Sequence, residues 1–139
     1  MLLLLPSISA LENDESPSVE IVNPKEGYLH LFGIPIFPIQ YTIALKGFTL
    51  KPIQILADDD FDESEDLLVT ISITGNGIFR KINYSTPAIW NEKNGYHELT
   101  VSGRDIDALG GFGYCMLIAT VEDSSGNIGS DELIFIFLF

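Results

Sequence analysis

Residues 112–139 read FGYCMLIATVEDSSGNIGSDELIFIFLF, and this stretch decides the fold. Two apolar runs, Phe112–Glu122 and Asn127–Phe139, flank the short polar sequence DSSGN at 123–127. Gly and Asn in a short connection favour a turn, and the β-branched and aromatic residues on either side favour extended strands. The stretch therefore predicts a β-hairpin at the end of the chain.

The rest of the chain repeats this pattern of short apolar runs separated by Gly, Pro, Asn and Asp. No window of a dozen residues has the i, i+3, i+4, i+7 apolar spacing of an amphipathic helix. Further strands are predicted at 18–23, within 28–50, and at 52–57, 67–74, 78–85, 86–90 and 96–102. Gly75-Asn76-Gly77 is predicted to form a tight hairpin turn. About seven to nine strands, with a turn roughly every ten residues, predict an all-β, antiparallel two-sheet sandwich.

Composition limits the classes of partner and cofactor. The chain has 139 residues, the size of a single domain, with 20 Asp and Glu against 7 Lys and Arg, a net charge of −13. A surface this acidic repels phosphates, so no nucleic-acid partner is expected, and anionic lipid headgroups are disfavoured as well. One Cys excludes an internal disulfide, and two His are too few for a His/Cys zinc site. We predict that no cofactor is required.

The N-terminus has the character of a processing segment. Residues 1–10, MLLLLPSISA, resemble the end of a secretory signal peptide, although a basic region is missing, as a misassigned start codon would explain. A frayed apolar tail is the alternative. Residues 11–17 are acidic and end in proline, so they are predicted to be a linker to a folded domain at 18–139. The protein is therefore predicted to be secreted or displayed at the cell surface.

Three motifs carry a resemblance to a known family: VEIVNP at 19–24, PAIWNEKNGYHELTV at 87–101 and ATVEDSSGN at 119–127. They resemble the immunoglobulin-like domains of prokaryotic secreted and cell-surface proteins. The resemblance implies a sandwich that serves as a spacer, display module or adhesive unit, and not an enzyme. The chain departs from that pattern in the long insert after the first strand, and in Cys115, where such domains often place an aromatic residue.

An acidic run lies between the predicted strands 52–57 and 67–74. It holds seven carboxylates in nine residues: Asp58, Asp59, Asp60, Asp62, Glu63, Glu65 and Asp66. It begins like an EF-hand loop, but Glu63 and Val69 occupy the positions of the required Gly and Glu. In an immunoglobulin topology this loop shares one end of the sandwich with residues 122–127. The hypothesis is a Ca²⁺ site, and the alternative is a solvated acidic loop. The predicted Ca²⁺ ligands are Asp58, Asp60, Asp62, Glu65, Glu122 and Asp123.

Two apolar segments need cover. No acidic residue occurs between Gly27 and Ala57, and the last run, LIFIFLF at 133–139, is apolar on both faces. The simplest prediction is that the 28–50 insert folds as an apolar hairpin over the outer side of the last strand. The alternative is that segments 28–50 and 133–139 form a docking face for a neighbouring domain or a second copy of the chain.

Other motifs carry weaker signals. Asn83-Tyr84-Ser85 is a glycosylation sequon, so Asn83 is a candidate glycan site on an exported chain. Cys115 is predicted to be a buried, inert thiol. His97-Glu98 begins an H-E-x-x-H motif, but Val101 replaces the second His. Trp90 is predicted to be a core or edge aromatic, with sugar stacking as the alternative.

Together these features predict a non-catalytic extracellular module for surface display, adhesion or protein–protein interaction. Its partner would be a protein or glycan at the cell surface. The alternatives are a carbohydrate- or Ca²⁺-binding accessory module and an appendage of a truncated secreted hydrolase.

Overall fold

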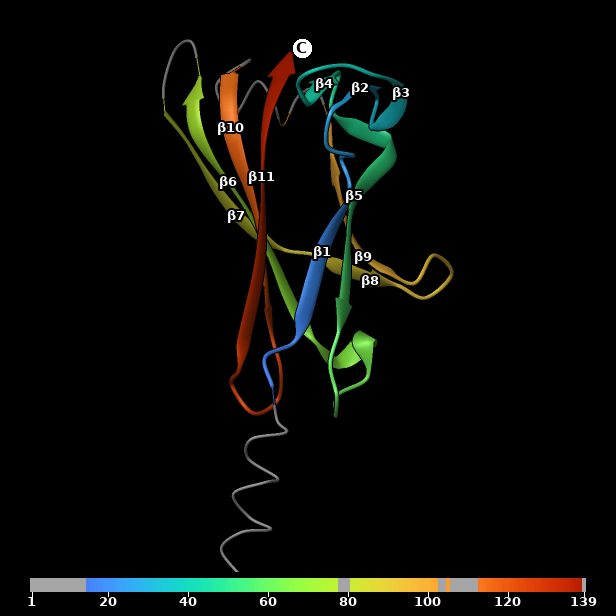
Figure 1. Ribbon diagram of the computed structural model, residues 1–139, viewed down its shortest axis with the longest axis vertical. Coiled ribbons are helices and arrows are strands. Elements are labelled where there is room, and N and C mark those ends of the chain that lie inside the picture. Colours follow the sequence, from blue (N-terminus) through green and yellow to red (C-terminus); the bar gives the residue numbers. More distant parts are fainter. Residues whose placement is uncertain (1–14, 78–80, 103–104, 106–112, 139) are drawn as a thin grey trace, which may run out of the picture.

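Two β-sheets packed face to face make up the domain, as a computed structural model shows (Figure 1). The structure describes residues 15–77, 81–102, 105 and 113–138. The predicted signal peptide at 1–10, and residues 11–14 of the predicted linker, lie outside these residues.

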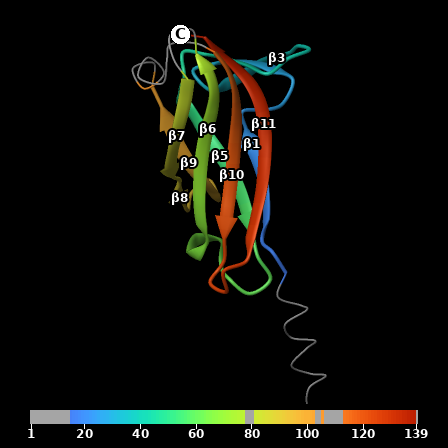
Figure 2. The same ribbon diagram turned by 90° about the vertical axis from the view of Figure 1, so that its left-hand side faces the viewer.

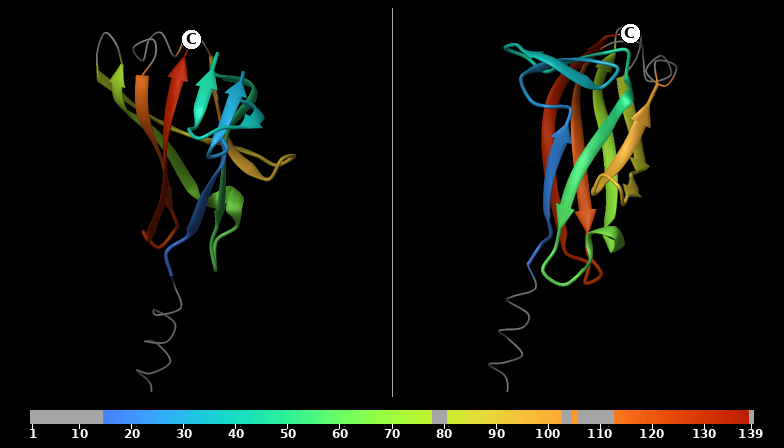
Figure 3. Two further views of the ribbon diagram at one scale, coloured as in Figure 1. Left: turned by 45° about the horizontal axis from the view of Figure 1, so that its top comes forward. Right: turned by 90° about the vertical axis from the view of Figure 1, so that its right-hand side faces the viewer.

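The smaller sheet has four strands and faces the viewer in the right-hand view of Figure 3. Their order is β1 (Ser18–Asn23), β5 (Phe48–Asp58), β9 (Tyr96–Val101) and β8 (Ile89–Asn91). All pairs in this sheet are antiparallel. A 3₁₀ turn, Ser64–Asp66, follows β5 in the acidic run.

The larger sheet has seven strands and faces the viewer in Figure 2. Their order is β3 (Ile34–Pro38), β2 (Tyr28–Leu31), β4 (Ile43–Leu45), β11 (Ile128–Leu138), β10 (Gly113–Glu122), β6 (Leu68–Gly77) and β7 (Lys81–Pro87). The pairs β2–β4 and β4–β11 are parallel, and the others are antiparallel. The predicted all-β, two-sheet architecture is thus confirmed, with eleven strands in the described residues instead of about seven to nine.

The core lies between the sheets and is built by alternation along each strand. On β10, Cys115, Leu117, Ala119 and Val121 are buried while the residues between them are not. The same period of two appears on β6 and β11, because neighbouring side chains of a strand point to opposite faces. Burying one large aliphatic side chain contributes about 1.5–3 kcal/mol, so this layer is the main source of stability.

The predicted tight turn at Gly75-Asn76-Gly77 is wrong. These residues are the end of β6, where Gly75 and Gly77 pair with Cys115 and Gly113 of β10. A Cβ on Gly75 would lie 2.2 Å from the carbonyl oxygen of Tyr114, so glycine is needed for close strand approach and not for a turn. The connection to β7, at 78–80, lies outside the described residues.

The insert forms the predicted hairpin, β2–β3, but does not cover the outer side of the last strand. Instead β4 pairs in parallel with Ile136–Leu138 of β11, so the insert extends the larger sheet at its edge. Main-chain hydrogen bonds hold β4 beside β11. Ile136 N–H donates to Thr42 O (2.9 Å), and Lys46 N–H donates to Leu138 O (3.0 Å). An edge strand left open would present unpaired donors and acceptors, and β4 satisfies those of β11.

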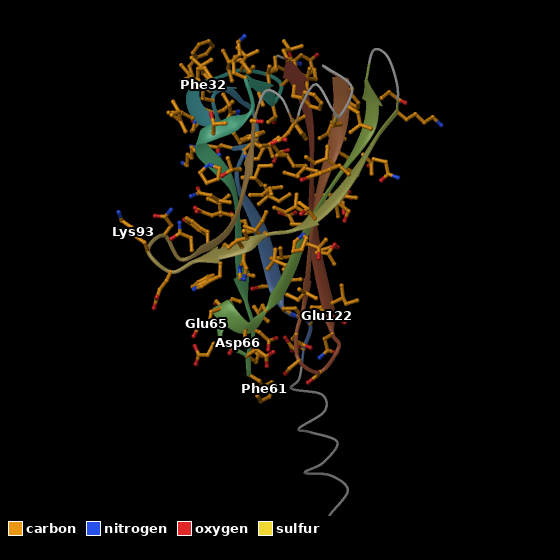
Figure 4. All side chains as sticks on the ribbon, turned by 180° about the vertical axis from the view of Figure 1, so that it is seen from behind. Phe32, Phe61, Glu65, Asp66, Lys93 and Glu122 are labelled. Atoms are coloured by element: carbon orange, nitrogen blue, oxygen red, sulfur yellow. The ribbon has the colours of Figure 1, made fainter. Side chains whose placement is uncertain are left out.

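The two ends of the domain differ in chemistry. In Figure 4, Phe32, in the turn between β2 and β3, lies at one end of the molecule. Phe61, Glu65, Asp66 and Glu122 lie at the opposite end. We call the first the hairpin end and the second the acidic end.

Candidate functional site

The acidic end brings together the two loops that the sequence predicted to be neighbours. The carboxylate of Asp62 accepts hydrogen bonds from both the backbone N–H (2.7 Å) and the hydroxyl (2.8 Å) of Ser124. The acidic run and the 122–127 turn are therefore joined directly, which confirms that they share one end of the sandwich.

Asp123 organises the turn between β10 and β11. Its carboxylate accepts hydrogen bonds from the backbone N–H of Ser125 (3.0 Å) and Asn127 (2.8 Å), and from the Asn127 side-chain amide (3.1 Å). Desolvation alone would raise the pKa of Asp123, but these donors and Gly126 outweigh it and hold the pKa below its usual value. The ionised Asp123 carboxylate therefore stabilises this turn as a hydrogen-bond acceptor.

The predicted Ca²⁺ ligands are not assembled into a cage. Asp58, Asp60, Glu65 and Glu122 are exposed, while Asp62 and Asp123 make the hydrogen bonds above. In the part of the chain that the structure describes, no group of three or more His, Cys, Asp or Glu side chains is placed to hold a metal ion. Because Ca²⁺ takes six to eight oxygens, binding would require these side chains to converge. The Ca²⁺ site stays a prediction.

A carboxylate–amide cluster lies on the outer face of the smaller sheet. Glu98 Oε2 accepts hydrogen bonds from Gln54 (2.7 Å) and Asn94 (3.0 Å), and Glu98 Oε1 accepts one from Asn91 (2.7 Å). Desolvation works against ionisation here, but the three amide donors prevail and lower the pKa of Glu98. A shallow hollow of about 580 Å³ adjoins the cluster, lined in part by Lys93 and Thr100. The sequence showed no signal for this cluster, because its members come from β5, β8, β9 and a loop.

Trp90 and His97 form an aromatic pair on the inner side of the same sheet. Trp90 pairs with His97 across β8 and β9, and their ring centroids are 5.0 Å apart. Neither His97 ring nitrogen makes a hydrogen bond of ordinary geometry with the described residues, and neither does the Trp90 indole N–H. Burial lowers the pKa of His97, and the weaker opposing effect of the Leu67 backbone does not offset it. This packing favours the core interpretation of Trp90.

Two buried polar residues that sequence reasoning missed hold the insert in place. Asn23 donates from its side-chain amide to the carbonyl oxygens of Gly33 (3.0 Å) and Pro52 (2.8 Å). His30 Nε2 accepts from Lys25 N–H (2.8 Å), so Nδ1 carries the proton and donates to Ile43 O (3.1 Å). Both residues are fully buried. They act as positioning residues for β2–β4.

Two other predicted sites differ in exposure: Asn83 is exposed and Cys115 is buried. Asn83 is exposed on β7, so its side chain is accessible to a glycosyltransferase. Cys115 is buried on β10, as predicted, and desolvation raises the pKa of its thiol to about 12. A thiol with that pKa stays protonated and unreactive at neutral pH.

The outer side of the larger sheet carries a continuous apolar surface. Ile43 is flanked by Leu29 of β2 and Ile136 of β11, and Ile136 in turn pairs with Tyr114 of β10. Directly paired residues share a face, so these four side chains form one unbroken apolar row across four strands. We call this surface the outer apolar face. It consists of Leu29, Leu31, Ile43, Leu45, Tyr114, Met116, Ile118, Ile134, Ile136 and Leu138.

None of these ten side chains is charged. The two most exposed are Tyr114, at 59%, and Ile134, at 48%. A hollow of about 240 Å³ lies beside them, and its lining includes Tyr41, Tyr114, Ile134 and Ile136 together with Glu26 and Gln40. On the neighbouring strand β6 the outward positions are Thr70, Ser72 and Thr74, which give the face a polar border. An apolar centre with a polar rim is the anatomy of a protein interface.

Comparisons with protein-family models, curated proteins and solved structures find no match to this chain. In the residues that the structure describes, no helix is long and apolar enough to cross a membrane.

Proposed function

We propose that this chain is a non-catalytic, extracellular immunoglobulin-like module that binds protein through the outer apolar face. The observation that carries the proposal is the unbroken uncharged surface over β2, β4, β11 and β10. Large exposed apolar patches on soluble domains mark interaction sites, because leaving them in water costs free energy.

Strand order supports the immunoglobulin-like assignment. An immunoglobulin sandwich sets strands A, B, E and D against C′, C, F and G. The order β1-β5-β9-β8 opposite β7-β6-β10-β11 corresponds to it, with β2–β4 inserted between the first two strands. The chain departs from antibody domains in having one Cys, and in carrying Trp90 on β8 instead of on the third strand of the pattern.

Photo-crosslinking in the organism that makes the protein would test the proposal. A photoreactive phenylalanine analogue replaces Tyr114 on the outer apolar face, or, in a control chain, Leu56, which is 42% exposed on β5 of the other sheet. Adducts of higher mass are expected from position 114 and not from position 56. No adduct at position 114, or equal yields at both positions, would contradict the proposal. Labelling intact cells with a membrane-impermeant reagent tests the extracellular location.

A second candidate function, carbohydrate binding, is favoured by the carboxylate–amide cluster around Glu98. Amides and carboxylates beside a shallow hollow are the groups that bind sugar hydroxyls. A glycan array probed with the wild type and with Glu98→Gln would test this. Equal or absent binding by the two proteins would exclude the cluster as a sugar site.

A further inference from the structure

We propose that the partner of the outer apolar face is a second copy of this chain, with the strands of the two larger sheets antiparallel to one another across the interface. This inference rests on the proposed function, since it names the partner of the same surface. Three features lead to it: the area of the face, its lack of charge, and the segregation of acidic residues along the sheet.

The exposed area suits a dimer of standard size. Tyr114, Ile134 and Leu31 on the face and Tyr41 beside it are each more than 40% exposed, and the other members are half-buried. Together they expose an area of the order of the roughly 800 Å² that each partner buries in a standard interface. The hollow beside Tyr114 can accept an aromatic ring from the other copy, in the way that anchor residues fill pockets in protein interfaces.

The absence of charge favours a copy over an unlike partner. A protein of net charge −13 attracts basic partners, but it attracts them to its acidic end and not to the central rows of this face, which hold no carboxylate. An uncharged surface, in contrast, can meet itself without like charges in contact. Pairing through the edge of β3 is the less favourable route to self-association, because Pro35 and Pro38 cannot donate main-chain hydrogen bonds there.

The acidic end sets the orientation. Glu122 lies on β10 beyond the outer apolar face, toward the acidic end, and Glu132 of β11 lies at the border of the face, where it pairs with Ile118. Two sheets packed face to face are about 10 Å apart, so a parallel arrangement would bring the two acidic ends together. An antiparallel arrangement centred near Ile136 separates them by about 50 Å, since each lies some eight residues away at about 3.3 Å per residue. That distance exceeds the screening length of about 8 Å at physiological ionic strength several times over.

Sedimentation equilibrium of the purified full chain tests the proposal. The wild type is expected to reach twice the mass of the chain as concentration rises to the hundred-micromolar range. Ile134→Lys and Tyr114→Lys each place an ammonium group in the interface and should weaken dimerisation at least tenfold. Ile89→Lys is the matched control, because Ile89 is more exposed but lies on the other sheet. Circular dichroism of each variant checks that the fold is kept.

A spin label on Ser124→Cys, whose backbone lies in the turn of the acidic end, tests the orientation. Dipolar coupling at about 50 Å or beyond is expected, and a distance below about 25 Å would overturn the antiparallel order. A wild type that stays monomeric overturns self-association, and so does a dimer that Ile89→Lys weakens as much as Ile134→Lys. If the chain is monomeric but position 114 still gives adducts of another mass, the proposed function stands and only this inference fails.

Discussion

Gly75 shows how one hydrogen atom in place of a side chain can decide strand packing. Its missing Cβ would stand 2.2 Å from Tyr114 O and 2.8 Å from Cys115 Cα, both backbone atoms of β10 that cannot move aside. We therefore expect Gly75→Ala to destabilise the protein by about 2–3 kcal/mol, as overpacking of a core does. Chemical denaturation measures the loss.

Gly95→Ala is the control for Gly75→Ala. Gly95 has a φ of +76° and no atom within 4 Å of the added Cβ, so only the backbone conformation is penalised, by about 1 kcal/mol. A Gly75→Ala loss no larger than that of Gly95→Ala would contradict the steric explanation.

His97 makes stability depend on pH. Because burial lowers its pKa below the ordinary 6.5, the unfolded chain binds a proton more readily than the folded one as pH falls through 6.5. The free energy of unfolding should therefore decrease from pH 7 to pH 5. His30, whose pKa burial also lowers, adds to the same trend.

Replacing the imidazole of His97 separates its contribution to the pH dependence of stability from that of His30. His97→Phe keeps an aromatic ring against Trp90 but cannot titrate, so its unfolding free energy should fall less between pH 7 and pH 5 than that of the wild type. Glu98 and Asp123 do not affect the comparison between pH 7 and pH 5. Acids with lowered pKa values lose their contribution to stability only below about pH 4.5. Equal pH slopes in the two proteins would show that His97 does not titrate on unfolding.

At the scale of elements, Asn23 connects β1, the β2–β3 turn and β5. Its amide donates to main-chain carbonyls of the last two. Asn23→Asp has the same shape but turns donors into acceptors facing carbonyl oxygens. We expect a loss of about 3 kcal/mol or more, the penalty for a buried charge without a partner. Asn76→Asp, exposed on β6, should change stability by less than about 0.5 kcal/mol.

Hydrogen exchange locates the effect of Asn23→Asp. The Phe32 N–H, which donates to Leu45 O (2.9 Å), should exchange faster in the variant than in the wild type, because the insert loses its attachment. Unchanged exchange at Phe32 would show that Asn23 does not hold the insert.

The elements that the sequence predicts well are those specified by local pattern. The hairpin around DSSGN formed as predicted, because its turn residues and its alternating strands are contiguous in the chain. The shared end of the loops 58–66 and 122–127 followed from strand order, and the Asp62–Ser124 hydrogen bonds confirm it.

The failures concern contacts between distant segments. Gly75-Asn76-Gly77 has the composition of a turn, and only the approach of β10, some forty residues later, makes it part of a strand. The insert is predominantly apolar, so its pattern does not distinguish covering the outer side of β11 from pairing with its edge. Asn23 and His30 act through main-chain groups that no side-chain pattern reveals.

At the scale of the whole molecule, charge is distributed unevenly from one end to the other. Repulsion among the carboxylates of residues 58–66 opposes folding and is screened by salt. Raising NaCl from 10 to 150 mM should therefore raise the thermal midpoint by about 2–4 °C. The variant Asp58→Asn, Asp60→Asn, Glu65→Gln should be more stable at low salt and respond less. An equal salt response of both proteins would locate the repulsion elsewhere.

Divalent cations distinguish screening from a true binding site. Screening depends on ionic strength, so several millimolar Ca²⁺ and Mg²⁺ at matched ionic strength should raise the midpoint equally. A cage made of Asp58, Asp60, Asp62, Glu65, Glu122 and Asp123 would favour Ca²⁺, because Ca²⁺ accepts irregular geometry whereas Mg²⁺ needs a strict octahedron. Asp62 and Asp123 already serve as hydrogen-bond acceptors, and binding would compete with Ser124 and Asn127 for them. We therefore expect equal shifts. An additional rise with Ca²⁺, lost in the triple variant, would instead demonstrate the site.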